Sequence, residues 1–322
     1  MHQMNIKWIY KNRIAEVVAD KKIIEDQQIV RVLKDKGFDV LVTFDSYDYR
    51  ILWRYGNDKS IRRYYNSLSN YPNPNRWETF DFINFLIYEL GYGRRIAIWF
   101  QDEKTLKTIS TAIDDYFIKG KKNIVALPKK LTHCRSCIEK GCMTNFLKHT
   151  ASVQNSLSIF KEGKILSACK ARKTDGKTLM KEKRNAAGDP ADYFEYIQFS
   201  FGNCITGDRL VMERMLGKNP SEEHLKDSFY PGISYYFDYQ KLLSHPDYCN
   251  DGYHPCKIKD SLSLNDYLHA IIIPKKEEKS LRPIISTDLI NRTIFMDNTG
   301  HDLWSWTSKC YKKIKKLNSL RY

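Results

Sequence analysis

A His-Thr pair, a loop arginine and a short run of glutamates are the residues whose types and spacing could act on a bound ligand. His149 and Thr150 stand in "KHTASVQNSLSIFKEG", directly before a stretch that places Val153, Leu157 and Phe160 on one helical face. Side chains at the point where a strand passes into a helix can face a ligand while the backbone stays fixed. We therefore expect His149 and Thr150 to line a binding site. The alternative is that the polar pair only helps the helix to begin.

A basic stretch and an aromatic segment follow this helix. Arg184 stands in "KRNAAGDPADYFEYIQFSF", near the end of the polar stretch 170–192, which is predicted to be a mobile loop because it has almost no apolar period. The segment 193–201, which begins with Tyr193, alternates like a strand. A guanidinium on such a loop could close over a bound anion and hold a phosphate with two hydrogen bonds.

The order of these features resembles the NAD-binding core of ADP-ribosyltransferases, and most of all the DarT-type enzymes, which modify bases in single-stranded DNA. The shared order is His-Thr, an amphipathic helix ended by Gly163, a short strand ending at Ser167, a basic loop with Arg184 and an aromatic strand. The resemblance covers about residues 145–300. It implies NAD as the cofactor and Arg184 as a catalytic residue. It also implies four cofactor-binding residues: His149, Thr150, Ser167 and Tyr193.

The resemblance further implies a catalytic glutamate after a strand. The segment "LHAIIIPKKEEKS" fits with Glu277 and Glu278 after a strand over 268–274, and Glu278 is favoured over Glu277 and over Glu213 in "GDRLVMERMLG". Breaking the bond between ribose and nicotinamide creates a cation-like transition state, which a carboxylate stabilises. Alternatively, "KKEEKS" is a solvated turn and Glu213 forms an ordinary helix ion pair.

Composition and charge suggest the partners. The 322 residues include 53 Lys+Arg against 38 Asp+Glu, which gives a net charge of +15 and attracts polyanions such as nucleic acid. The 21 tyrosines could stack on unpaired bases. Single-stranded DNA, or RNA, is therefore the expected acceptor, and a toxin or defence role with an antitoxin or defence partner is implied by the resemblance. The sequence shows neither a long apolar run nor a secretion signal, so we expect a cytoplasmic protein without a membrane partner.

Two domains are expected to position these residues. Residues 1–130 read as a small α/β domain of unknown role, and residues 131–322 as an α+β ADP-ribosyltransferase-like domain. The first domain should contain a parallel strand–helix–strand crossover. Its expected elements are strands over 38–44, 94–100 and 123–127 and a helix over 102–120.

A cysteine cluster offers a competing interpretation. Cys134, Cys137 and Cys142 form C-x2-C-x4-C, which resembles the start of a zinc knuckle, a nucleic-acid-binding module. His133 or His149 could be a fourth ligand. Three reduced thiols in a basic linker are the alternative, and no metal ligand is assigned.

The competing function belongs to another class. A nucleic-acid-binding protein or metal-dependent nuclease without NAD chemistry could use carboxylates at strand ends. Asp39, Asp45 and Asp48 stand at the ends of the strand expected over 38–44. Acidic residues at strand ends are also common turn formers.

Overall fold

The structure, a computed structural model, describes most of the chain in separate ranges. These are residues 6–10, 31, 33–45, 48–54, 64–66, 74–100, 103–125, 145–182, 189–252 and 254–319. The chain divides into one unit of Met1–Gly141 with Asn250–Tyr253 and another of Cys142–Cys249 with His254–Tyr322. The predicted boundary at residue 130 lies outside the described ranges. Both units mix helices and strands, which confirms the expected mixed α/β class at that level.

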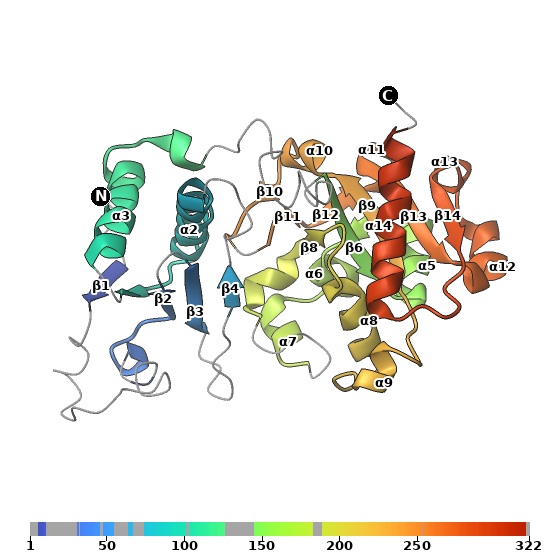
Figure 1. The fold of residues 1–322 in the computed structure, drawn as a ribbon, viewed down its shortest axis with the longest axis horizontal. Coiled ribbons are helices and arrows are strands. Elements are labelled where there is room, and N and C mark those ends of the chain that lie inside the picture. The colour runs from blue at the N-terminus through green and yellow to red at the C-terminus, as the bar shows by residue number, and fades with distance from the viewer. Residues whose placement is uncertain are drawn as a thin grey trace. The chain divides into compact units, whose positions relative to one another are not determined.

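The first unit contains a five-stranded sheet in the order β1–β5–β2–β3–β4 (Figure 1). Strands β1, β5 and β2 run parallel, with β1 at one edge, and β3 and β4 continue the sheet in antiparallel pairs, β3 with β2 and β4 with β3. The strands expected over 38–44 and 94–100 are confirmed as β2 and β5. The bounds are β1 (Ile6–Tyr10), β2 (Val40–Asp45), β3 (Asp48–Arg54), β4 (Tyr64–Asn66) and β5 (Ile96–Phe100).

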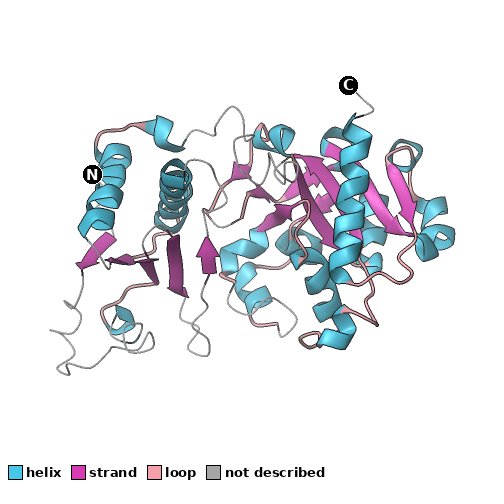
Figure 2. Cartoon of the chain, viewed as in Figure 1, coloured by secondary structure: helices cyan, strands magenta, loops and turns pink. Residues whose placement is uncertain are grey.

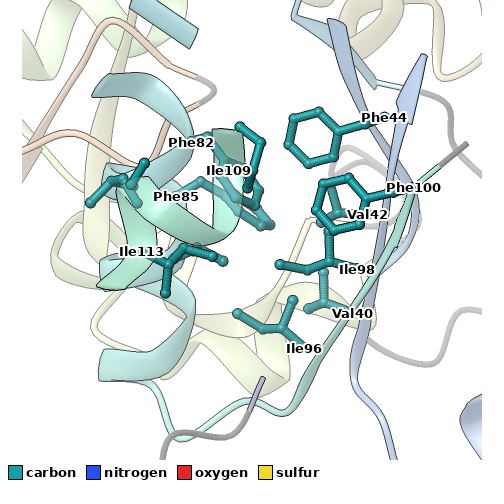
Figure 3. Packing of buried hydrophobic residues seen from close by; sticks show 13 residues of the cluster. Val40, Val42, Phe44, Phe82, Phe85, Ile96, Ile98, Phe100, Ile109 and Ile113 are labelled. Carbon is teal, nitrogen blue, oxygen red and sulfur yellow. The ribbon is translucent and has the colours of Figure 1, made fainter. Parts of the chain in front are cut away.

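Two helices, α2 (Pro74–Gly91) and α3 (Glu103–Ile113), cover this sheet. Figure 3 shows their apolar side chains facing those of β2 and β5, and Phe44 stacks on Phe100 with ring centroids 5.1 Å apart. A π-helical turn, Asp114–Ile118, extends α3 towards Gly120, which has φ 66°, so the expected helix end is confirmed.

One expectation for the first unit is wrong. The residues Lys122–Val125 form a short 3-10 helix where a strand was expected over 123–127. The crossover through α3 is therefore not made, and the parallel neighbours are instead β1 with β5 and β2 with β5. A run of four or five apolar residues has no period that separates a strand from a helical turn.

The second unit contains a seven-stranded sheet in the order β10–β11–β8–β6–β9–β13–β14. Neighbours are antiparallel except β13 and β14, which are parallel. Strands β7 (Lys164–Leu166) and β12 (Ser261–Ser263) pair separately. The bounds in the large sheet are β6 (Phe146–Ala151), β8 (Tyr196–Phe201), β9 (Ile233–Asp238), β10 (Tyr248–Cys249), β11 (Cys256–Lys259), β13 (Leu268–Pro274) and β14 (Thr293–Met296).

Helices lie on both faces of this sheet (Figure 2). The helix α14 packs on one face, where its buried Trp306 joins an apolar cluster with Phe146 of β6 and Ile272 of β13. On the other face, Phe160 of α5 contacts Tyr235 of β9 with ring centroids 6.0 Å apart. The helices are α5 (Val153–Glu162), α6 (Ala168–Arg172), α7 (Gly176–Met180), α8 (Thr206–Leu216), α9 (Glu222–Leu225), α10 (Tyr239–Leu243), α11 (Leu264–Tyr267), α12 (Glu278–Leu281), α13 (Thr287–Ile290) and α14 (Leu303–Ser319).

The helix after the His-Thr pair forms as its sequence predicts. The hydroxyl of Ser152 accepts a hydrogen bond from the Asn155 N–H at 3.1 Å, and Gly163 ends the helix with φ 64°. Strand β13 likewise has the bounds expected over 268–274.

The stretch 170–192 is not the continuous loop that was expected. The caps Ser167 and Asp175 begin the short helices α6 and α7, because each side chain accepts a backbone N–H three residues later. The aromatic segment also differs, since Ala191–Glu195 forms a 3-10 helix and the strand begins only at Tyr196.

Among the described residues, no helix combines the length and the apolar character needed to cross a bilayer. The cysteines in that part of the chain are free thiols: Cys169, Cys204, Cys249, Cys256 and Cys310.

Candidate functional site at the fork between β6 and β8

Strands β6 and β8 separate within the large sheet. They pair only at Leu147 with Phe201 and at Lys148 with Ser200, whereas β6 pairs with β9 along its whole length. Beyond Lys148, the Nδ1 of His149 lies 3.1 Å from the carbonyl oxygen of Gln198. We call this place, formed by His149 of β6 and Gln198 of β8, the fork.

The hydrogen bond at the fork fixes the tautomer of His149. A carbonyl oxygen can only accept, so Nδ1 must carry the proton and the Nε2 of the neutral ring is an acceptor. Burial lowers the pKa of His149, the Gln198 carbonyl opposes this shift, and the Arg214 guanidinium lowers the pKa further. The imidazole is therefore neutral at pH 7 and presents a lone pair that can accept a hydroxyl proton.

Arg214 of α8 brings positive charge to His149. The side chain of Arg214 reaches solvent. Partial removal from water and the guanidinium of Arg172 lower the pKa of Arg214, while the carboxylates of Asp189 and Glu213 raise it. Arg172 is held by Glu182, whose carboxylate accepts from it at 2.6 Å. Two guanidiniums whose positive charges act on each other are suited to bind an anion with several oxygens, such as pyrophosphate.

Thr150 does not share the surroundings of His149. Successive side chains of a strand point to opposite faces of a sheet. The Oγ1 of Thr150 is buried without a hydrogen-bond partner, and a Cβ added to Gly207 of α8 would lie 2.6 Å from it. The structure therefore places Thr150 beneath α8, and only His149 of the predicted pair lies at the fork.

Tyr193 is linked to the fork through Gln198. The Nε2 of Gln198 donates to the carbonyl of Tyr193 at 3.4 Å, and the Nζ of Lys257 lies 3.8 Å from the centre of the buried Tyr193 ring. Ser167, in contrast, is a buried helix cap whose Oγ accepts the Lys170 N–H at 3.4 Å.

No protein-family model, curated protein or solved structure matches the chain.

The predicted catalytic pair is not brought together by the described contacts. Arg184 lies outside the described residues. Glu278 begins α12, after β13, and its carboxylate accepts from the Nε and Nη2 of Arg282 at 3.1 and 2.5 Å and pairs with Lys275. Lys275 and then Arg282 lower the pKa of Glu278. Strand β9 separates β13 from β6, which spaces these two strands about 10 Å apart.

The other two glutamates differ in their surroundings. Glu277 accepts a hydrogen bond from the hydroxyl of Tyr230 at 2.5 Å, and burial followed by this contact raises the pKa of Tyr230 to about 12. Glu213 precedes Arg214 on α8 and acts electrostatically on its guanidinium. Of the glutamates considered, Glu213 is therefore the one that shares a charged neighbour with His149.

Most residues of the competing nuclease and zinc hypotheses lie outside the described part of the chain. Cys134, Cys137 and Cys142 lie outside it, and the side chains of Asp45 and Asp48 are not described. The carboxylate of Asp39 accepts the backbone N–H of Arg95 at 2.8 Å. The described residues contain no group of His, Cys, Asp and Glu side chains that could hold a metal ion.

Sequence patterns did not indicate the roles of Gln198, Arg172 and Arg214. Each acts through a partner that is distant in sequence, so no local motif marks it. One signal was present: α8 carries Arg214 next to Glu213, and both occupy one turn of a helix that covers the sheet.

Proposed function

We propose that the second unit binds NAD at the fork and transfers ADP-ribose to nucleic acid, with single-stranded DNA as the first candidate acceptor and RNA as the second. The observation that carries the proposal is the hydrogen bond from His149 Nδ1 to the Gln198 carbonyl. It holds a neutral histidine at the edge of a split sheet, with its second nitrogen ready to accept a hydroxyl proton.

The residues around the fork suit the parts of a dinucleotide. The Nε2 of His149 would accept a hydrogen bond from a ribose hydroxyl, and the guanidiniums of Arg214 and Arg172 would neutralise the pyrophosphate. Arg184, in the segment between α7 and the 3-10 helix, would add a further guanidinium. When bound, NAD supplies the glycosidic bond between ribose and nicotinamide that the reaction breaks.

A carboxylate must also stabilise the developing positive charge on the ribose. Glu278, which the resemblance suggests, would have to leave Lys275 and Arg282 to serve in this role. Glu213 acts on Arg214 and is the alternative. Separate substitutions of the two glutamates distinguish these assignments.

The acceptor is inferred from charge. The net charge of +15 favours a polyanion, and a base with an exposed nitrogen is a competent nucleophile only where it is unstacked. A transferase that modifies nucleic acid would harm the cell that makes it, which supports a toxin or defence role with an antitoxin or other controlling partner.

The test uses NAD that is radiolabelled in its adenylate phosphate. The full chain is incubated with this NAD and single-stranded DNA, duplex DNA, RNA or protein. We expect label on single-stranded nucleic acid, and its loss in His149→Ala, Arg184→Ala and one of Glu278→Ala or Glu213→Ala. His224→Ala is the matched control, because His224 is also half-buried in this unit but caps α9. Unchanged NAD in every reaction, or equal labelling by His149→Ala and His224→Ala, would overturn the proposal.

A further inference from the structure

The outer face of α14 has a high and one-sided charge. Its 17 residues include five lysines and no acidic residue. The lysines are Lys309, Lys312, Lys313, Lys315 and Lys316. The inner face is apolar and packs into the core of the second unit through Leu303, Trp306, Cys310 and Ile314. Figure 1 shows α14 lying along the sheet of this unit.

The spacing of these lysines brings positive charges close together on the helix surface. Lys309 and Lys313 stand four residues apart, as do Lys312 and Lys316, and such pairs are neighbours on a helix surface. Like charges at this spacing destabilise a helix. A bound polyanion would remove this repulsion, which no carboxylate of α14 can do.

Some exposed lysines elsewhere in the chain have carboxylate partners. Lys119 and Lys121 both pair with Asp115, at 2.9 and 3.0 Å, and Lys226 pairs with Glu222. In the part of the chain that the structure describes, Lys312 and Lys315 have no carboxylate partner, although the Nζ of Lys315 lies 5.3 Å from the centre of the Tyr311 ring. Lys312 and Lys315 thus differ from Lys119, Lys121 and Lys226, whose charges are balanced by carboxylates.

An exposed aromatic ring lies on the same side of the helix as Lys312 and Lys315. The side chain of Trp304 is 45% exposed and stands eleven residues before Lys315, which is about three turns of an α-helix, whereas Lys312, eight residues on, lies about 80° round the helix. These intervals place the indole about 12 Å and 16 Å along the helix axis from the two lysines. Cations near an exposed aromatic ring can contact phosphates while the ring stacks on a base.

We propose that α14 is a docking surface for single-stranded nucleic acid, with Lys312 and Lys315 contacting phosphates and Trp304 stacking on an unpaired base. A membrane fits this surface less well, because the apolar face of α14 is already buried and cannot enter a bilayer. A duplex fits less well because its bases are stacked on one another. This inference rests on the proposed function only in the claim that the bound nucleic acid is then modified, because binding to α14 needs no NAD.

The test is fluorescence anisotropy of a labelled oligothymidylate of about 20 nucleotides with the full chain, in the absence of NAD. The double variant Lys312→Gln/Lys315→Gln is compared with the control Lys119→Gln/Lys121→Gln, which removes the same charge from lysines that have a carboxylate partner. We expect the α14 variant to bind about tenfold more weakly at 100 mM salt and its salt slope to fall by about 1.4, and the control to change less than about twofold. Equal weakening in both variants would mean that only net charge matters and would overturn the proposal.

A second variant tests the stacking contact. Trp304→Ala should weaken oligothymidylate binding on the order of tenfold and leave duplex binding within about twofold. Equal losses for both ligands, or tighter binding to phosphatidylserine vesicles than to the oligonucleotide, would also overturn the proposal. His149→Ala should bind the oligonucleotide like the native chain, so a failure of the transferase proposal remains distinguishable from a failure of this one.

Discussion

The fork and the turn after β13 satisfy their titratable groups in different ways. At the fork, His149 bonds to a carbonyl 49 positions away along the chain, inside a split between two strands. At the turn, Glu278 takes its partners from Lys275 and Arg282, three and four positions away on the surface. The hydrogen bond of His149 forms only when the tertiary structure brings Gln198 next to it. The ion pairs of Glu278, in contrast, need only a local turn, because its partners are close in sequence.

The difference extends to the ion pairs beside each region. One residue before the fork, the Nζ of Lys148 lies 2.7 Å from the Oδ2 of Asp208, and both side chains are only 1% exposed. The hydroxyl of Thr307 on α14 also reaches this carboxylate, at 3.4 Å. The buried pair therefore joins β6 to α8 and α14, while the pairs of Glu278 join residues within a single turn.

The largest expected effect is from breaking the buried pair. Asp208→Ala leaves the ammonium of Lys148 buried without its carboxylate, so we expect the free energy of unfolding to fall by about 3–5 kcal/mol. Urea unfolding of the full chain, followed by tryptophan fluorescence, measures the change. A loss below about 1 kcal/mol would show that the pair is not buried in solution.

The contact between α8 and β6 gives the next largest effect. A Cβ on Gly207 would lie 2.6 Å from Thr150 Oγ1, so Gly207→Ala should destabilise the protein by about 1–3 kcal/mol through overpacking. Gly91→Ala is the matched control, because it also replaces a helical glycine but meets nothing within 4 Å. Thermal unfolding of both variants checks this, and equal melting temperatures would contradict the close packing above Thr150.

Replacing the hydroxyl of Thr150 sharpens the comparison between the two members of the His-Thr pair. Thr150→Val exchanges a buried oxygen without a partner for a methyl group, so stability should stay equal or rise by about 1 kcal/mol. NAD turnover should be retained, whereas His149→Ala should abolish it. A large loss of turnover in Thr150→Val would mean that the hydroxyl of Thr150 contacts the ligand after all.

The dependence of stability on pH should be smaller. The pKa of His149 is lowered in the folded protein, so the unfolded chain binds a proton first as the pH falls below about 6.5. The stabilisation is thus fully present above that pH and is lost as the pH falls towards the lowered pKa. Urea midpoints at pH 7.5 and 5.5 should differ more in the native chain than in His149→Gln. An equal difference in both would contradict a neutral, buried ring.

The smallest effect is expected at the turn. Glu278→Gln should leave the urea midpoint unchanged, because its partners are exposed and remain hydrated when the charge is removed. A clear loss of stability would mean that the turn is tied to the sheet more firmly than its contacts indicate.

Local signals explain how much of this arrangement could be predicted from sequence. The stop at Gly163 and the apolar run of β13 act within a few residues, and both form as predicted. The split between β6 and β8 depends instead on where the pairing of two distant strands ends. No residue type marks that point, so the role of Gln198 could not be predicted.

The errors have similar physical causes. The short helices within 170–192 depend on single caps, Ser167 and Asp175, in a stretch with little apolar period. Thr150 was paired with His149 because the two are adjacent in sequence, although adjacency in a strand sends side chains to opposite faces. The preference for Glu278 relied on its position after a strand, and its lysine and arginine neighbours were already visible in the sequence.

Calorimetric titration of the full chain with NAD tests the central claim most directly. The variants are His149→Ala, Arg214→Gln and the control His224→Ala. We predict saturable binding by the native chain and by His224→Ala, and binding at least about tenfold weaker in His149→Ala and Arg214→Gln, because each loses a contact to the dinucleotide at the fork. Equal affinity in all four proteins, or no binding by the native chain, would contradict the assignment of the fork as an NAD site.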